Sequence, residues 1–310
     1  MTAPDAPAPP AGRGAPDTPA PAAGRPAPGG SGPAPGGWPD LDGLPGVPEL
    51  VERARSAVIA VRQLPANRRG WARTGAAASV RAARASAVLE GGSAAFADPR
   101  AGAQAAAGPG DGMPGDGMLG AATSVGDLGA AAPQTLTVTD PVLAGALRVA
   151  AEIGQLATVW RRAPLQALAR LHTLAAADLV DADRLGRPRS EPGVGARLAS
   201  LAQVVTQAPW SGPVTVAVVH GELLALRPFG VADGVVARAA ARLTMIATGL
   251  DPQGLTVPEV GHLRAGSGYP LAAAGFAAGD RDGLQRWIDH VCTALLAGAR
   301  EARSIAAAAG

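Results

Sequence analysis

The segment with the clearest chemical pattern is Arg227 to Arg238, which reads RPFGVADGVVAR. A Pro-Phe pair and a run of small residues precede a helical pattern that begins near Gly234. The first amide groups of a helix lack partners within the helix and lie at the positive end of its dipole, so such a loop suits a phosphate group. Arg238 lies one turn into the predicted helix, where its guanidinium can act as an anion partner.

The side chains that phosphate transfer requires are mostly absent from this loop. Arg227 cannot act as a general base, because a guanidinium group stays protonated. Asp233 is expected at the N-cap of the helix, where its carboxylate would accept hydrogen bonds from the same amide groups and repel a phosphate. The loop therefore has the outline of an anion site with an acidic residue at its centre.

The layout resembles the Fic (Fido) family, whose signature is H-P-F-x-[D/E]-G-N-G-R-x-x-R. Members of this family typically transfer AMP from ATP to a protein hydroxyl group. Four residues match the signature: Pro228, Phe229, Gly234 and Arg238. The departures are Arg227 at the position of the base histidine, Val231 for the acid that holds the metal ion, Ala232 and Asp233 for Gly-Asn of the phosphate nest, and Val235 for the first arginine.

A second motif lies far upstream of the loop. The stretch SAVLEG, Ser86 to Gly91, resembles the inhibitory-helix motif [S/T]-x-x-x-E-[G/N] of family members that carry it before the core. Ser86 and Glu90 are four residues apart and share a helix face. The resemblance implies that Glu90 pairs with the last arginine of the signature, which is Arg238 here.

Stretches beside the loop extend the resemblance over roughly residues 41–308. VTVAVVHGELLALRPF resembles the family's helix before the loop and places His220 where a histidine is often found, and RAAARLTMIATGLDP resembles the helix after it. GYPLAAAGFAAGDRDGLQRWIDHVCTALLAGA resembles the closing helices. LGRPR, Leu185 to Arg189, lies where the target-docking flap is expected, although it matches poorly.

The departures fall on the groups that carry the chemistry. Transfer of AMP needs a base, a metal ion that bridges phosphates, and cations that hold developing charge. Loss of a base alone costs about 10²- to 10⁴-fold in rate. The sequence therefore predicts a degenerate, non-catalytic Fic-fold protein that acts in regulation by binding a nucleotide or a protein. Asp233, Gly234 and Arg238 would then hold ATP with Mg²⁺ weakly.

Two other function classes stay open from the sequence. In the first, a transferase of altered chemistry held inactive by Glu90, Asp233 would replace the metal ligand, Arg227 would hold a phosphate and His220 would supply the base. His220 lies on an apolar helix, however, where a lone histidine is more often a packed core residue. The second is a dehydrogenase, supported only by glycine clusters such as GPGDGM, which follow no strand pattern.

Helical periodicity dominates the chain outside its low-complexity parts, and Pro and Gly mark the joins. We therefore expect an all-α fold, which the resemblance makes a Fic/Fido-like helical bundle. The expected helices cover residues 47–64, 68–92, 141–160, 164–179, 194–207, 213–226, 234–248 and 281–308, with a closing glycine pair at Gly91 and Gly92. The best strand candidate is a short hairpin over Arg184 to Glu191.

Composition divides the chain into four parts. Residues 1–40 form a Pro/Ala/Gly-rich arm that buries too little apolar area to offset its ordering entropy, so we expect it to be disordered. Residues 41–92 hold the N-terminal helices, including the inhibitory-type helix. Residues 93–135 form a flexible low-complexity insertion, and residues 136–310 form the degenerate Fic/Fido-like domain.

The charge pattern gives no sign of nucleic-acid or membrane binding. The 310-residue chain has a net charge of +2, and its basic residues, all arginine, are interspersed with acidic ones. The N-terminus lacks the apolar stretch of a secretory signal, and Arg148 and Glu152 interrupt the longest apolar segment. We therefore expect a cytoplasmic protein. Several family relatives dimerise, but no helix face here is diagnostic, so a homodimer stays open.

The remaining residue types that often carry chemistry point to structural roles. Cys292 is the single cysteine and is expected to be a small buried hydrophobe. His172 and His262 show no metal-ligand spacing, so no metal site is expected, and His290 should be at the surface or half-buried. Four tryptophans are expected to anchor the core: Trp71, Trp160, Trp210 and Trp287. Trp38 would anchor the arm to the domain or dock elsewhere.

Overall fold

The computed structural model describes residues 39–96, 138–207 and 209–310. Regular structure in these residues is helical, with no β-strand, so the predicted all-α fold is confirmed. The predicted arm (1–40), with Trp38, and the predicted insertion (93–135) lie almost wholly outside the described residues.

Most helices begin and end within a few residues of the predicted ranges. They are α1 (Val47–Arg62), α2 (Pro65–Leu89), α4 (Pro141–Arg162), α5 (Pro164–Ala175), α6 (Val194–Gln207), α7 (Gly212–Leu226), α8 (Asp233–Ala247), α9 (Pro258–Arg264), α10 (Gly268–Ala278) and α11 (Arg281–Ala309). A 3₁₀ turn, η1 (Ala182–Arg184), lies between α5 and α6.

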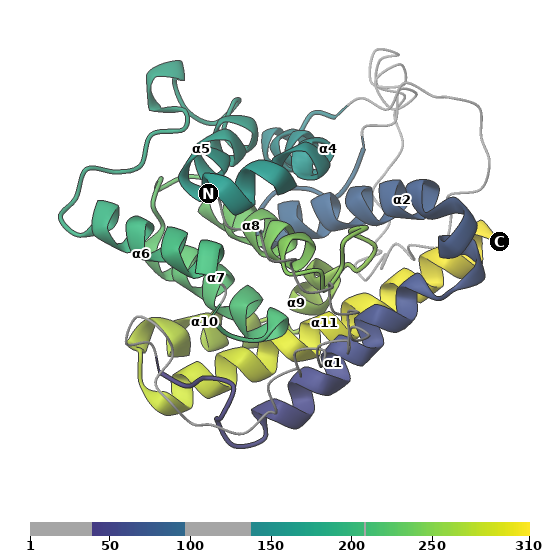
Figure 1. Cartoon of the computed structure of the whole chain (residues 1–310). Helices are drawn as coiled ribbons and strands as arrows, with labels where there is room; N and C mark the ends of the chain where they lie inside the picture. Colours follow the sequence, from purple (N-terminus) through teal and green to yellow (C-terminus); the bar gives the residue numbers. More distant parts are fainter. Residues whose placement is uncertain (1–38, 97–137, 208) are drawn as a thin grey trace, which may run out of the picture.

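Helix α8 lies at the centre of the molecule, and every residue from Asp233 to Met245 is buried. It packs against α7, α4, α5 and α2, which surround it in Figure 1. Helix α7 is apolar around nearly its whole circumference, as expected for a helix buried on all sides. The loop 227–232 joins these two core helices, so both of its ends are fixed by packing.

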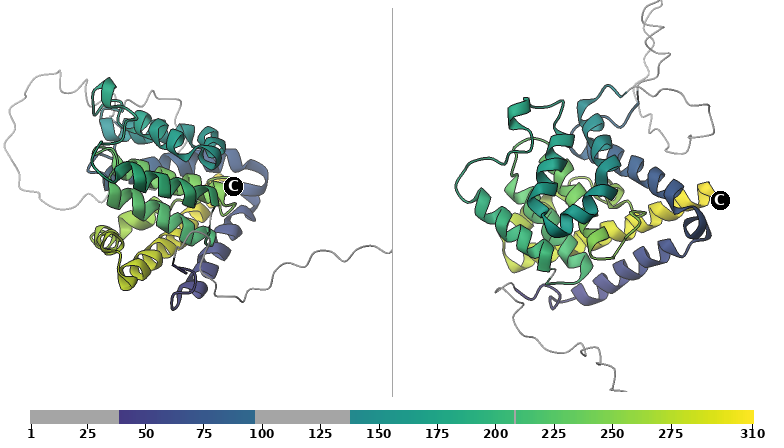
Figure 2. Two further views of the ribbon diagram at one scale, coloured as in Figure 1. Left: turned by 60° about the vertical axis from the view of Figure 1, so that its left-hand side comes forward. Right: turned by 45° about the horizontal axis from the view of Figure 1, so that its top comes forward.

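The long helix α11 supports the other side of the core. It packs on α1, α9, α10 and α2, and α1 runs alongside it in Figures 1 and 2. Trp287 on α11 is fully buried, and its indole nitrogen donates to the carbonyl oxygen of Ala217 on α7 at 2.7 Å. This contact ties the C-terminal helix to the helix that precedes the loop.

Helix α4 is long and apolar enough, by length and composition, to cross a membrane. In the structure it packs against α5, α2 and α8 instead. Arg148 and Glu152 on α4 form ion pairs with Asp178 and Arg170, at 2.6 and 3.6 Å. These contacts make α4 a component of the bundle, and no membrane association is evident.

The hairpin predicted over Arg184 to Glu191 is wrong, because these residues form the end of η1 and an irregular segment. The backbone groups find partners elsewhere. The Gly186 amide donates to Nδ1 of His172 at 2.9 Å, and the Arg189 amide donates to the carbonyl oxygen of Pro228 at 2.7 Å. Pro188 has no amide hydrogen to contribute to a strand ladder.

Two further expectations need correction. Helix α9 was not predicted, because its seven residues are too few to show a period. Its Gly261 packs directly on the backbone of Ala294, where a Cβ would collide. Trp71 is 48% exposed rather than a core anchor, since it follows Gly70, a non-helical residue that kinks the start of α2. The other tryptophans in this set are buried as predicted: Trp160, Trp210 and Trp287.

Candidate functional site

The end of α2 is built so that it presents a carboxylate at a fixed position. The Gly91 amide donates to the Val88 carbonyl at 3.0 Å and the Gly92 amide donates to the Ala87 carbonyl at 2.8 Å. Together with a left-handed Gly91 (φ 86°), these bonds form a Schellman motif, in which glycine is favoured. Glu90 is the helix C-cap, so its side chain leaves the helix at a defined point.

Arg238 is buried in the core, with 3% of its surface exposed, and it contacts the end of α2. Its Nε donates to the Ser86 hydroxyl at 2.8 Å, and one terminal nitrogen donates to the Ser86 carbonyl at 2.9 Å. The same nitrogen lies 3.0 Å from Oε2 of Glu90. The contact between Glu90 and Arg238 that the sequence predicts is therefore present.

The other oxygen of Glu90 closes the start of α8. Oε1 accepts a hydrogen bond from the Gly234 amide at 3.2 Å. A Cβ at Gly234 would collide with the Glu90 carboxylate, so the close approach depends on glycine. The Glu90 carboxylate is therefore bonded to the Gly234 amide and the Arg238 guanidinium. These are groups that the sequence predicts would hold an anionic ligand.

The loop places Asp233 differently from the expected N-cap. The N-cap is Ala232, a left-handed residue (φ 55°), and Asp233 is the first residue of α8. Its carboxylate turns back into the loop, where it accepts the amides of Phe229 at 2.9 Å and Gly230 at 2.7 Å. Burial raises the pKa of Asp233, although these two hydrogen bonds oppose the shift.

Arg227 lies on the outside of the loop. It ends α7 in a left-handed conformation (φ 46°), and its side chain is 69% exposed. Its Nε lies 4.0 Å from the nearer Asp233 oxygen. The Arg227 guanidinium faces solvent while the Asp233 carboxylate is buried, and the Arg227 charge opposes the rise in the pKa of Asp233. A guanidinium group cannot remove a proton.

The segment after η1 clamps the loop through Arg189. Its Nε donates to the Arg227 carbonyl at 2.8 Å, and a terminal nitrogen donates to the Leu226 carbonyl at 3.1 Å. These carbonyls belong to the last turn of α7, where no amide of the helix can reach them. The Arg189 clamp was not predicted; the resemblance assigned Leu185 to Arg189 only to the place of a target-docking flap.

Beyond Arg238, a cluster of rings fills the space between α7, α9, α10 and α11. Nε2 of His220 lies 2.9 Å from the Tyr269 hydroxyl, and Nδ1 of His262 lies 2.9 Å from Nε2 of His290. The rings of His220 and His262 meet edge to face at 4.9 Å. Burial lowers the pKa of both His220 and His262 well below the usual value, and the Arg238 charge adds to the effect.

Because His220 is buried in this cluster, it is not placed to act as a base in the loop. It is fully buried, as a packed core histidine would be, and its contacts are Tyr269 and neighbouring rings. His290 is half-buried, as predicted. His172 is also buried, and it stacks on Phe229 with 4.1 Å between ring centres. No set of three or more His, Cys, Asp or Glu residues among the described ones could hold a metal ion.

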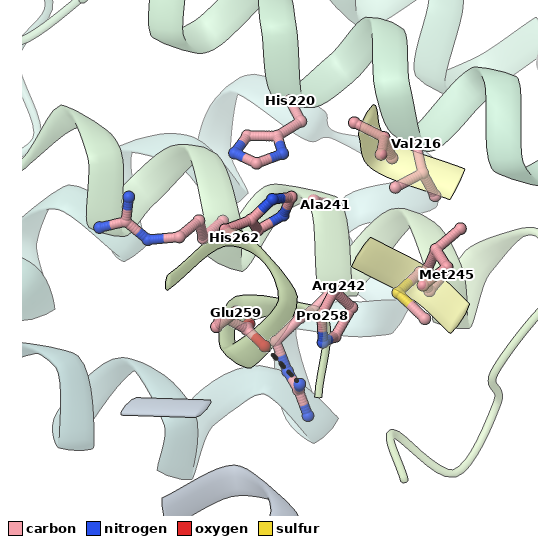
Figure 3. Close-up of a pocket in the computed structure, with 11 residues that line it drawn as sticks. Val216, His220, Ala241, Arg242, Met245, Pro258, Glu259 and His262 are labelled. Carbon is pink, nitrogen blue, oxygen red and sulfur yellow. Dashed lines mark hydrogen bonds and ion pairs between the residues drawn. The ribbon is translucent and has the colours of Figure 1, made fainter. Parts of the chain in front are cut away.

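The space around Arg238 is small. The two cavities that it lines measure about 10 and 20 Å³, enough for a water molecule and no more. Figure 3 shows the first, with His220 and His262 above it and Arg242 paired with Glu259 below. Arg242 lies 3.4 Å from Glu259 and donates to the carbonyls of Gly254 and Thr256, at 3.0 and 2.9 Å.

Arg242 and the ring cluster are the parts of the site that the sequence did not reveal. Arg242 follows Arg238 by one helical turn, so its place on the same face was the available signal. The histidines come from three different helices, and no local pattern joins them. Cys292 is buried as expected, and burial raises the pKa of its thiol to about 12, which leaves it unreactive.

Comparison with known proteins gives no relative from which a role could be transferred. No protein-family model matches the sequence, and no curated protein matches it significantly.

Proposed function

We propose that this chain is a degenerate Fic-fold protein that regulates by binding, with a nucleotide or a protein as its ligand. The observation that carries the proposal is the contact of Glu90 with both Arg238 and the Gly234 amide. The resemblance places an inhibitory glutamate on the last arginine of the signature, and these two residues are 148 positions apart in the sequence.

The loop supports binding rather than group transfer. A transfer reaction needs donors aimed at the developing charge of the phosphoryl group. Here the amides of Phe229 and Gly230 are already bonded to Asp233, and the base position holds a guanidinium. An incoming phosphate would have to displace one carboxylate and approach another.

The second candidate is a transferase of altered chemistry that Glu90 holds inactive. Asp233 would serve as the metal ligand and Arg227, which is exposed beside it, would hold a phosphate. Both oxygens of Asp233 accept backbone amides, and His220 is buried against Tyr269, so this candidate lacks a free ligand and a base.

The first test measures binding. We expect Mg²⁺-ATP to leave the melting temperature of the native chain unchanged, because Glu90 occupies the anion position. In Glu90→Ala the Arg238 guanidinium and the Gly234 amide lose their carboxylate partner, and ATP at 100 times its Kd would add about 2.7 kcal/mol to the free energy of unfolding. Glu49→Ala, which removes an exposed carboxylate on α1, is the matched control.

Three outcomes separate the alternatives. A shift in Glu90→Ala alone supports a masked nucleotide site. No shift in either protein removes the nucleotide and leaves protein binding as the proposed activity. An equal shift in the native chain, Glu90→Ala and Glu49→Ala contradicts masking by Glu90.

The second test measures chemistry. We expect no transfer of label from α-labelled ATP to this chain or to lysate proteins, with or without Glu90→Ala. Transfer that appears in Glu90→Ala and disappears after a further Asp233→Ala would establish the altered transferase instead.

A further inference from the structure

A separate groove lies on the face of α2 away from Arg238. It runs between α2, α9 and α11, which pack together, and has a volume of about 570 Å³. Side chains that define it include Val80, Arg84 and Val88 on α2, Leu263 and Arg264 on α9, and Glu301 on α11. We call it the α2–α9 groove. Figures 1 and 2 show α2 beside the C-terminal half of α11.

The apolar lining of the groove is exposed to an unusual degree. Among the described residues, six large hydrophobic side chains are exposed, and three of them line this groove: Val80, Val88 and Leu263. Beneath them, Ala78, Ala82, Val257 and Ile305 form a small buried cluster. A contiguous exposed apolar surface of this kind marks a binding site more often than chance.

The polar side chains of the groove carry an excess of positive charge. Three arginines and one carboxylate line it. Glu301 is shared by Arg81 and by Arg264, whose contact is 3.1 Å, so one guanidinium of this pair stays unneutralised. Arg84 donates to the Ala94 carbonyl at 2.8 Å and lies over the Phe96 ring, and no carboxylate of the described residues pairs with it. The Arg264 side chain is 62% exposed and accessible to a ligand.

The size of the groove suits a slim small molecule. The lining residues of α2 extend from Ala76 to Val88, a rise of about 18 Å. The groove volume lies within the range of about 300–1,000 Å³ that is typical of small-molecule sites.

We propose that the α2–α9 groove binds an amphipathic carboxylate with an unbranched apolar tail, which is the chemistry of a fatty acid. The tail lies along Val80, Val88 and Leu263, and the carboxylate meets the guanidinium of Arg264, with Arg84 as a second cation. Each methylene that leaves water contributes about 0.8 kcal/mol, so affinity should rise with tail length.

The experiment compares three probes with twelve-carbon chains, each below its micelle concentration or solubility limit, with calorimetric titration as the readout. Laurate should bind the full chain, dodecanol should bind at least tenfold more weakly, and dodecyltrimethylammonium should not bind. Octanoate, with a shorter tail, should bind more weakly than laurate. These comparisons use the native protein and do not depend on any variant.

Two surface variants locate the site. Leu263→Asp should abolish laurate binding and Arg264→Gln should weaken it at least tenfold. Leu271→Asp, at an exposed leucine on α10, and Arg55→Gln, at an exposed arginine on α1, should bind laurate as the native chain does. Unchanged far-ultraviolet circular dichroism checks that each variant is folded.

Several results would overturn the proposal. Absence of laurate binding, equal binding of laurate and dodecyltrimethylammonium, or equal losses in Leu263→Asp and Leu271→Asp would each do so. Binding of an acidic amphipathic helical peptide by a chain that ignores laurate would assign the groove to a protein partner.

Discussion

Asp233 decides what the loop can hold. Its carboxylate fills the space in front of two loop amides and is itself buried. Because burial raises the pKa of this group, the loop tolerates its charge only with the help of those amides. The Asp233 carboxylate therefore satisfies the Phe229 and Gly230 amides, which are not available to another acceptor.

Gly234 gives the sharpest test at this scale. A methyl group there would collide with the Glu90 carboxylate, so we expect Gly234→Ala to lower the free energy of unfolding by about 1–3 kcal/mol. Gly154→Ala on α4, where a Cβ meets nothing within 4 Å, should instead be neutral or stabilise by about 0.5–1 kcal/mol. Urea unfolding of both variants checks this. Equal changes in the free energy of unfolding in the two variants would show that the effect comes from replacing a helical glycine and not from the contact with Glu90.

The sequence revealed some residues of the site and concealed others. Ser86, Glu90 and Arg238 could be foreseen, because the resemblance to two family motifs implies their contact. The four-residue spacing adds only that Ser86 and Glu90 share a helix face. The direction of the Asp233 carboxylate could not be foreseen. It depends on the left-handed backbone of Ala232, and alanine rarely adopts that conformation.

At the scale of elements, the Arg189 clamp joins two segments that carry no common pattern. Its guanidinium satisfies carbonyls in the last turn of α7, so it holds the loop against the helix end. We expect Arg189→Ala to speed hydrogen exchange of the Phe229 and Gly230 amides and to lower the free energy of unfolding by about 1 kcal/mol.

The neighbouring Arg187 supplies the control for the clamp, because it is exposed and its side chain forms no hydrogen bond or ion pair with the part of the chain that the structure describes. Exchange in Arg187→Ala should match the native chain. Similar acceleration in both variants would mean that general charge near the loop, rather than the two carbonyl contacts, slows exchange.

Long periodic helices were predictable, and short or irregular elements were not. Helices α6 and α11 have strong apolar periods and follow the expected ranges closely. Helix α9 is too short for a period, and the segment after η1 is shaped by partners outside itself. Tertiary contacts, which no local pattern encodes, decide such segments.

At the scale of the whole molecule, the histidines link stability to pH. All four histidines of the chain, His172, His220, His262 and His290, have a pKa lowered mainly by burial. The unfolded chain, with histidine pKa values near 6.5, therefore takes up protons before the folded chain does. Stability is fully present above about pH 6.5 and is lost as the pH falls toward the folded pKa values.

We expect the free energy of unfolding to fall between pH 7.5 and 5.5, by up to about 1.4 kcal/mol per pH unit for each histidine that stays neutral. Urea unfolding at several pH values measures the slope, and His290→Asn, at a half-buried position, should reduce it. A flat profile would contradict burial of the neutral rings. Asp233 and Asp289, whose pKa values are raised by burial, act in the opposite direction in the acidic range near the ordinary carboxyl pKa.

Two faces of helix α2 lie in different surroundings. One face holds Ser86 and Glu90 against Arg238, and the other lines the groove with Val80 and Val88. Thermodynamic reciprocity then applies to any ligands that bind on the two faces: if occupancy of one face shifts the helix, each ligand changes the affinity for the other by the same factor. Coupling between the two faces through α2 could thus be measured as a change in the affinity of either ligand.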